Sequence, residues 1–266
     1  MIRIVQMIVA AGLVSAPNLA LVVAAQSAPP QASASQAQGP GVPVVAPDAE
    51  LMLKQMAAYI GSAEQFTFQA DITFDHVLPS GQKLQFSAVE EVALQRPNGL
   101  YVDWSGDLGD RQFWYDGKSV ILYDPATPFY ASGPAPADID AMLDKTEAQL
   151  NFTPPLADFL YHDPYQKVRQ RVQYGFDLGS NDVNGQNCRT FAFVEQDIDW
   201  QIWISAGPQI VPCKLVITYK TRPSQPQFTA VFSGWDFAPR IAAPVFTPTP
   251  PAALVKVPFD TVTATK

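Results

Sequence analysis

Apolar and polar residues alternate along several stretches of this chain, as expected of β-strands that bury one face. The clearest stretch is 66–74, where apolar residues occupy the even positions and polar residues the odd positions. A similar alternation runs from Cys213 to Lys220, with Val216 as the exception on the polar side. Further strands are expected at 83–96, at 100–104, at 113–123, from about 173 onward, within 188–204 and at 228–237.

Two stretches repeat their apolar residues with the period of a helix. Residues 48–60 predict one helix, and residues 139–161 predict a helix followed by a shorter one after Pro154-Pro155. Tight turns between strands, such as the one at Asp116-Gly117, indicate antiparallel neighbours. The pattern predicts a mainly β protein with helices: a strongly curved antiparallel sheet or unclosed β-barrel, with an N-terminal helix and a helical lid.

The strand expected at 83–96 places charge among apolar residues. In an unbroken register, Glu90 and Arg96 share the inward face with Leu84, Phe86, Ala88, Val92 and Leu94. Burying either charge is costly unless it is paired. The alternative is a β-bulge near Glu90-Glu91, which would turn Glu90 to the other face.

The N-terminus resembles an export signal. Arg3 precedes an apolar run that ends in Val23-Ala24-Ala25, which favours a signal peptide over residues 1–25. The alternative is a transmembrane anchor, since the run approaches the length that spans a bilayer. Residues 26–47 contain mainly Pro, Ala, Ser, Gln and Gly and predict a disordered linker. The folded domain is expected at 48–260, with a tail at 261–266.

Charge and cysteine content narrow the classes further. The net charge of −8 and scattered basic residues argue against a nucleic-acid partner. The sequence has two cysteines, Cys188 and Cys213, each at the start of an outer strand of the predicted meander at 188–220. Export to an oxidising compartment favours a disulfide between them, and two buried thiols are the alternative. A zinc site would require more ligands at close spacing.

Residues suited to catalysis are few. The two histidines, His76 and His162, lie in no metal-binding or Ser-His-Asp pattern and are interpreted as surface residues. Glu195, Asp197 and Asp199 could bind Ca²⁺, but they lack the spacing of a loop site, which favours a solvated turn. We therefore expect no catalysis, no cofactor and no metal.

Four segments resemble landmarks of the periplasmic lipoprotein carrier LolA and its LolB relatives, in the same order: 92–98, 116–118, 123–125 and 246–251. The motif Asp-Trp-Gln-Ile-Trp-Ile at 199–204 further resembles a group of predicted periplasmic proteins of unknown function with this fold. The resemblance implies a periplasmic protein whose helices close over an apolar cavity for acyl chains. It also implies that Arg96 holds the lid in the closed form. The cysteine pair and the linker depart from the LolA pattern.

The concave face is the predicted binding site for an acyl-chain-like or lipoprotein ligand. The predicted ligand-binding residues are Phe68, Ile72, Phe74, Phe86, Val92, Leu94, Leu156, Phe159, Leu160, Trp200 and Trp203. If the helices fill the barrel, these residues form an ordinary core instead. The sequence thus favours a non-catalytic carrier that also contacts a membrane or envelope protein. A periplasmic protein-interaction or regulatory module is the alternative, and an enzyme ranks third.

Overall fold

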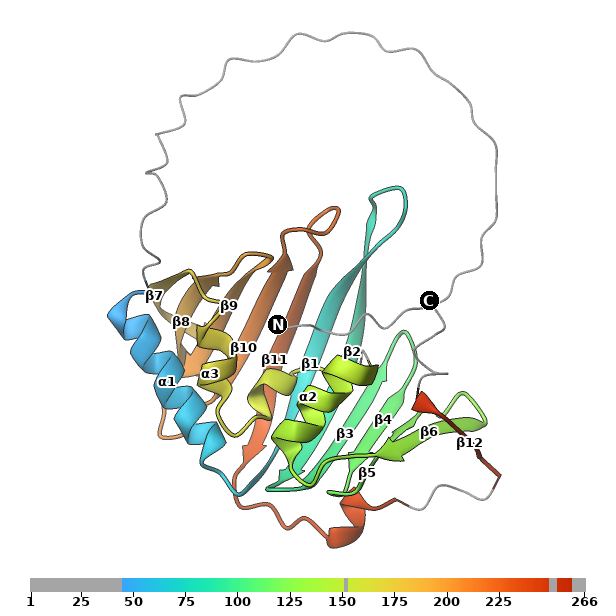
Figure 1. Cartoon of the computed structure of the whole chain (residues 1–266). Helices are drawn as coiled ribbons and strands as arrows, with labels where there is room; N and C mark the ends of the chain where they lie inside the picture. Colours follow the sequence, from blue (N-terminus) through green and yellow to red (C-terminus); the bar gives the residue numbers. More distant parts are fainter. Residues whose placement is uncertain (1–44, 151–152, 249–252, 260–266) are drawn as a thin grey trace, which may run out of the picture.

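The computed structural model describes residues 45–150, 153–248 and 253–259, apart from the side chains of Gln149 and Leu150. Within these residues, twelve strands form one open sheet with helices across its concave face (Figure 1). The predicted fold class is confirmed. None of the helices in these ranges combines the length and the hydropathy needed to span a membrane. The predicted signal peptide and tail lie outside the described residues.

The strands follow one another in two meanders. In chain order they are β1 (Gln65–Val77), β2 (Lys83–Gln95), β3 (Gly99–Gly106), β4 (Arg111–Tyr115), β5 (Ser119–Tyr123), β6 (Phe129–Pro134), β7 (Tyr174–Val183), β8 (Gln186–Val194), β9 (Ile198–Ser205), β10 (Pro212–Tyr219), β11 (Gln227–Asp236) and β12 (Val255–Val257). Their order across the sheet is β12-β6-β5-β4-β3-β2-β1-β11-β10-β9-β8-β7. All neighbours pair antiparallel except β12, which pairs parallel with β6. The sequence pattern predicted neither β6 nor β12.

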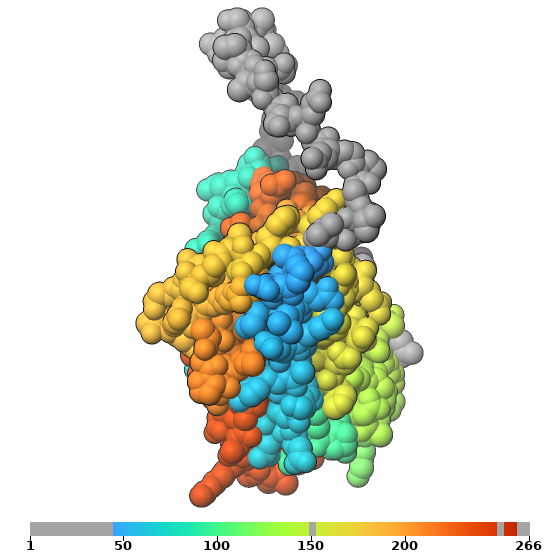
Figure 2. Space-filling model, turned by 90° about the vertical axis from the view of Figure 1, so that its left-hand side faces the viewer, coloured from blue at the N-terminus to red at the C-terminus, as the bar shows by residue number. Residues whose placement is uncertain are grey.

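In the described part of the chain, three α-helices and two 3-10 helices accompany the sheet. They are α1 (Pro47–Gly61), α2 (Ile139–Leu150), η1 (Ala157–Phe159), α3 (Pro164–Arg169) and η2 (Ala243–Phe246). Helix α1 buries Leu53, Met56 and Ile60, and Figure 2 shows it between the β7–β8 strands and the chain around α3.

The second lid helix expected after Pro154-Pro155 is only the three residues of η1. Leu156 has a left-handed φ of 54°, so a right-handed helix cannot include this residue and begins only at Ala157. Helix α3 was not expected, although Pro164 at its first position and Asp163 as its cap are ordinary start signals.

The described chain begins earlier than the expected domain boundary at Asp48. Val45 forms a parallel bridge with Gly175, and the Ala46 N–H donates to the Gly175 carbonyl at 2.9 Å. Gly175 belongs to the edge strand β7, whose outer backbone groups need such a partner. Residues 45–47 are therefore part of the folded domain, and residues 26–44 of the predicted linker lie outside the described residues.

The register of β2 is unbroken on both sides. Glu90 pairs with Ala70 of β1 and with Trp104 of β3, with no bulge at either ladder. Its side chain is fully buried, and its oxygens have no hydrogen-bond partner among the described residues. The alternative of a bulge near Glu90 is therefore wrong, and the carboxyl group faces the core.

The predicted disulfide is present. Cys188 of β8 is bonded to Cys213 of β10, although β9 lies between these strands in the sheet. The bond is possible because β9 ends at Ser205, which pairs with Cys188, so that the disulfide passes the end of that strand. It fixes one end of the three-stranded meander.

Candidate functional site

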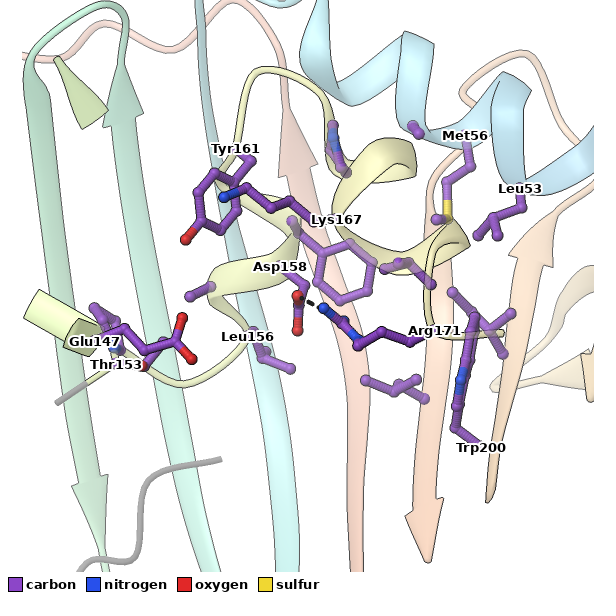
Figure 3. Close-up of a pocket in the computed structure, with 18 residues that line it drawn as sticks. Leu53, Met56, Glu147, Thr153, Leu156, Asp158, Tyr161, Lys167, Arg171 and Trp200 are labelled. Carbon is purple, nitrogen blue, oxygen red and sulfur yellow. Dashed lines mark ion pairs between the residues drawn. The ribbon is translucent and has the colours of Figure 1, made fainter. Parts of the chain in front are cut away.

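A cavity of about 190 Å³ lies between the helices and the concave face of the sheet (Figure 3). Its walls come from α1, from β9 and β10, and from the chain between α2 and Arg171. We call residues 153–161, which form much of the outer wall, the lid segment. The residues that line the cavity are Leu53, Met56, Ala57, Glu147, Thr153, Pro154, Leu156, Ala157, Asp158, Phe159, Tyr161, Pro164, Lys167, Val168, Arg171, Trp200, Ile202 and Leu215.

The floor of the cavity is apolar. Alternation along β9 turns Trp200 and Ile202 to the concave face, and Leu215 is opposite Ile202 on β10. All three side chains are buried. The ring of Phe193 stacks on that of Trp200 at 4.2 Å, which holds the indole in place.

One wall of the cavity is charged. Arg171 lies between two carboxylates: its Nη2 is 3.6 Å from Oδ1 of Asp158, and its Nε is 3.3 Å from Oε2 of Glu195. The second oxygen of Glu195 accepts a hydrogen bond of 2.9 Å from Nε1 of Trp200. Glu195 is only 6% exposed, so its interpretation as part of a solvated turn is wrong. Burial raises the pKa of Asp158 to about 6, although Arg171 opposes the shift.

A second charged group ties the lid segment to the helices on either side. The Tyr161 hydroxyl donates to Oδ1 of Asp144 in α2 at 2.9 Å, and Nζ of Lys167 in α3 lies 2.7 Å from the same oxygen. The Lys167 ammonium also lies 4.1 Å from the centre of the Tyr161 ring. The end of the lid segment is thus bound to both α2 and α3.

Arg96 contacts the lid segment from β2. Its Nη1 and Nη2 donate to the carbonyls of Leu160 and Tyr161 at 3.1 and 3.0 Å, and its Nε donates to the Ala63 carbonyl at 3.1 Å. Burial lowers the pKa of Arg96, with Asp140 opposing, but a guanidinium remains charged at neutral pH. The group borders a second hollow, of about 740 Å³, that is more open than the cavity. Both carbonyls of Leu160 and Tyr161 belong to the lid segment, as expected if Arg96 holds the lid in the closed form.

The lid segment also carries local strain and close packing. The left-handed backbone of Leu156 is rare for a bulky residue, and such outliers persist where the surroundings hold them. Directly after the lid segment, a Cβ atom on Gly61 would collide with the His162 carbonyl oxygen, so α1 approaches this part of the chain only because position 61 is glycine.

Only part of the predicted binding surface lines this cavity. Leu156, Phe159 and Trp200 do so, whereas Phe68, Ile72, Val92, Leu94 and Leu160 are buried in the core and are not among the lining residues. Phe74 and Phe86 are partly exposed.

Other aromatic rings occupy much of the concave face. Phe68 stacks on Trp235 at 4.5 Å, and Phe159 meets Phe232 edge to face at 5.4 Å. Trp203 lies on the opposite face from Trp200, with the Lys214 ammonium 4.9 Å from its ring centre. The expectation that Trp203 faces the concave side is therefore wrong.

Sequence reasoning missed Asp158 of the lid segment, Lys167 of α3 and Arg171, which follows α3; the fold brings all three to the cavity. One signal in the sequence could have pointed to Arg171: it lies close to the apolar residues Val168 and Val172, next to which a buried charge would need a partner. Among the described residues, no group of three or more His, Cys, Asp or Glu side chains could hold a metal ion. His76 and His162 are exposed.

The open sheet with helices over its concave face has the architecture that the resemblance to LolA and LolB implied. The sequence matches the family described as "Predicted periplasmic protein (DUF2092)" over residues 49–260. Because the match covers most of the chain, the protein belongs to this family. The predicted periplasmic location and the resemblance to a group of predicted periplasmic proteins are confirmed.

Several solved structures are similar to the chain. Lipoprotein LppX from Mycobacterium tuberculosis is 10% identical, with a TM-score of 0.45 over 71% of this chain and 95% of LppX. LprF from Mycobacterium bovis is 14% identical, with a TM-score of 0.46 over 76% and 97%. A LolA superfamily protein from Nitrosomonas europaea is 9% identical, with a TM-score of 0.38 over 75% and 97%. No curated protein matches the sequence.

Proposed function

We propose that this protein is a non-catalytic periplasmic carrier that binds an acyl-chain-like ligand, free or attached to a lipoprotein, on the apolar floor beneath the lid segment. The observation that carries the proposal is the cavity, which has Trp200, Ile202 and Leu215 on one side and Leu156 and Phe159 of the lid on the other. Buried apolar walls with a few polar groups at one end are typical of small-molecule sites.

The cavity is small for the proposed ligand. Pockets for drug-sized ligands have volumes of about 300–1,000 Å³, so 190 Å³ accommodates only part of a long chain. A longer ligand requires the lid segment to move, and that motion breaks the bonds from Arg96 to Leu160 and Tyr161.

The energies of opening and binding are of comparable size. A hydrogen bond to a charged group contributes roughly 1.5–3 kcal/mol, so breaking two of them costs about 3–6 kcal/mol before water replaces them. Burying a chain of about ten methylenes contributes on the order of 8 kcal/mol. A chain of that length compensates for opening, whereas a much shorter chain does not.

Displacement of an uncharged fluorescent probe tests the proposal. Phenyl-naphthylamine should bind the delipidated protein saturably, and dodecanol should displace it. Phe159→Asp, which places a charge on the lid face of the cavity, should weaken dodecanol binding about tenfold or more. Phe176→Asp is the matched control, because Phe176 is 49% exposed on β7. Unfolding curves establish that both variants are folded, and absence of saturable probe binding to the wild type would contradict the proposal.

A protein-interaction module is the second candidate. The edge strand β7 exposes Phe176 and Leu178, with 49% and 52% of their surface accessible, and an exposed apolar edge suits strand addition by a partner. A stable protein complex recovered with an empty cavity would favour this function over the carrier.

A further inference from the structure

Equal numbers of acidic and basic side chains line the cavity. Glu147 and Asp158 are the acids, and Lys167 and Arg171 are the bases. The Lys167 ammonium is engaged outside the lining as well, because it lies 2.7 Å from Oδ1 of Asp144. The lining therefore offers no surplus charge of either sign that would select a charged head group, and the selection depends on hydrogen bonds.

Arg171 holds a buried donor that has no acceptor. Its Nε lies 3.3 Å from Oε2 of Glu195, whereas its Nη2 is buried and makes no hydrogen bond to the described residues. Oδ1 of Asp158 lies 3.6 Å from Nη2, which is longer than a hydrogen bond. Leaving a buried donor in this state costs free energy, so a group that accepts from Nη2 would bind there favourably.

The carboxylate of Asp158 offers the complementary acceptor. Figure 3 shows it directed toward Arg171, within the space that the lining residues surround. Burial raises the pKa of Asp158 to about 6 although Arg171 opposes the shift, which means that the surroundings stabilise its charge less well than water does. A donor placed beside this carboxylate would supply part of the missing stabilisation.

The gap between these two groups has the size of one oxygen atom. An oxygen at about 2.9 Å from both Nη2 and Oδ1 completes a triangle on their separation of 3.6 Å. A hydroxyl group can accept from a guanidinium and donate to a carboxylate at the same time. We propose that the cavity selects uncharged amphiphiles with a hydroxyl head group, which bridges Arg171 and Asp158 while the chain lies on the apolar floor. This inference rests on the proposed carrier function and specifies the ligand class of the same site.

A charged head group would meet a like charge at this position. An ammonium group between the two side chains lies against the guanidinium of Arg171, and a carboxylate lies against that of Asp158. Like charges in contact repel strongly in a partly buried site. A hydroxyl group makes both contacts without such a repulsion.

Two isomeric ligands separate the hydroxyl group from the chain. Dodecanol and undecyl methyl ether contain the same atoms, but the ether oxygen accepts a hydrogen bond without donating one. Each is used to displace phenyl-naphthylamine from the delipidated full-length protein at pH 8, where Asp158 is ionised. Dividing the dissociation constant of the ether by that of dodecanol gives the preference for the alcohol. Water hydrates the two isomers differently, so this preference is compared between wild type and variants.

Substitution of Asp158 tests the bridge. Asp158→Leu keeps the shape of the side chain and removes the acceptor, so the preference for dodecanol should fall about tenfold. Asp197→Leu is the matched control, because Asp197 is exposed on the turn before β9, and it should keep the wild-type preference. If urea unfolding shows that Asp158→Leu does not fold, Asp158→Asn, with a weaker uncharged acceptor, should lower the preference about threefold. An unchanged preference in the folded variant would show that Asp158 pairs with Arg171 directly and would overturn the inference.

Charged ligands with the same chain test the selection in the wild type. Dodecylamine and dodecanoate should each bind about tenfold more weakly than dodecanol at pH 8. Tighter binding of either one than of dodecanol would overturn the inference and leave the carrier function intact. Failure of all four ligands to displace the probe would instead count against the carrier function, and the inference would fall with it.

Discussion

Trp200 and Glu195 are joined by a hydrogen bond of 2.9 Å from the indole Nε1 to Oε1 of the carboxylate. The other oxygen of Glu195 faces Arg171, so one buried carboxylate connects the floor of the cavity to its charged wall. A buried acid in this position satisfies a buried donor and a buried cation at once.

Replacing Glu195 with leucine should therefore destabilise the fold. The change leaves the Trp200 N–H without its acceptor and Arg171 without its closer partner, and we expect a loss of about 3 kcal/mol in the free energy of unfolding. Urea unfolding measures this loss. Asp197→Leu, at an exposed position two residues away, should change stability by less than about 0.5 kcal/mol. Similar losses in the two variants would contradict the assignment.

Arg96 is predicted to act on the lid more than on folding. In Arg96→Leu, the carbonyls of Leu160 and Tyr161 lose their charged donor, but they border an open hollow where water can replace it. We expect dodecanol to dissociate at least about tenfold faster, with a stability change of about 1 kcal/mol. Stopped-flow mixing of the dodecanol complex with excess phenyl-naphthylamine measures the rate, because the probe binds as dodecanol leaves. Arg96→Lys keeps the charge without the three-way geometry and should also release faster. Dodecanol release at the wild-type rate in both variants would refute the role of Arg96 in holding the lid closed.

Glu90 is predicted to make stability depend on pH. Burial without a hydrogen-bond partner raises its pKa well above the ordinary value. The folded state holds the Glu90 proton more tightly than the unfolded state does. The resulting contribution to the free energy of unfolding is therefore fully present below the unfolded pKa of about 4.3. It is lost as pH rises through the folded pKa. Glu90→Gln should flatten this decline in urea unfolding measured across pH. Glu91→Gln, on the exposed face of β2, should not alter the decline, and equal slopes in all three proteins would disprove the assignment to Glu90.

The disulfide is predicted to stabilise the domain by restricting the unfolded chain. Cys188 and Cys213 are separated by 25 residues, and a loop of that size gives about 3 kcal/mol in the chain-entropy treatment. Reducing the wild type should lower the free energy of unfolding by about that amount. The double variant Cys188→Ser with Cys213→Ser should give the same value with and without reductant. A wild type that is equally stable after complete reduction would count against this contribution.

Local pattern predicted the parts of the fold that depend on local chemistry. Alternation identified β1 and β2, because the side-chain period of a strand is fixed at two. It placed Glu90 on the inner face only for an unbroken register, and a bulge that turns Glu90 outward was the alternative. Strand β6, with the sequence Phe-Tyr-Ala-Ser-Gly-Pro, shows no such alternation, and the edge strand β12 has only three residues, too few to show a period. The parallel pairing of β12 with β6 also joins segments that are distant in the sequence.

The site was harder to predict, because it depends on which side chains fill the curve of the sheet. Phe68 and Leu94 have the pattern of a pocket wall, but the helices and the ring of Trp235 cover this part of the concave face. Asp158, Arg171 and Glu195 come from three separate segments and meet only after the lid packs on the sheet. The spacing of these three residues along the chain does not indicate that they come into contact.

The order of the strands has a consequence for how the protein folds. Strands β1 to β6 and strands β7 to β11 are each joined by local connections, and the two groups meet only where β1 pairs with β11. At this seam Ala70 is opposite Phe232, more than half the chain away. Local hairpins close quickly, whereas such a distant pairing must first overcome the entropy of closing a long loop. Docking of the two groups at the seam is therefore the expected rate-limiting step. The floor of the cavity belongs to the later group while Met56 precedes β1, so the cavity is completed only when that step is over.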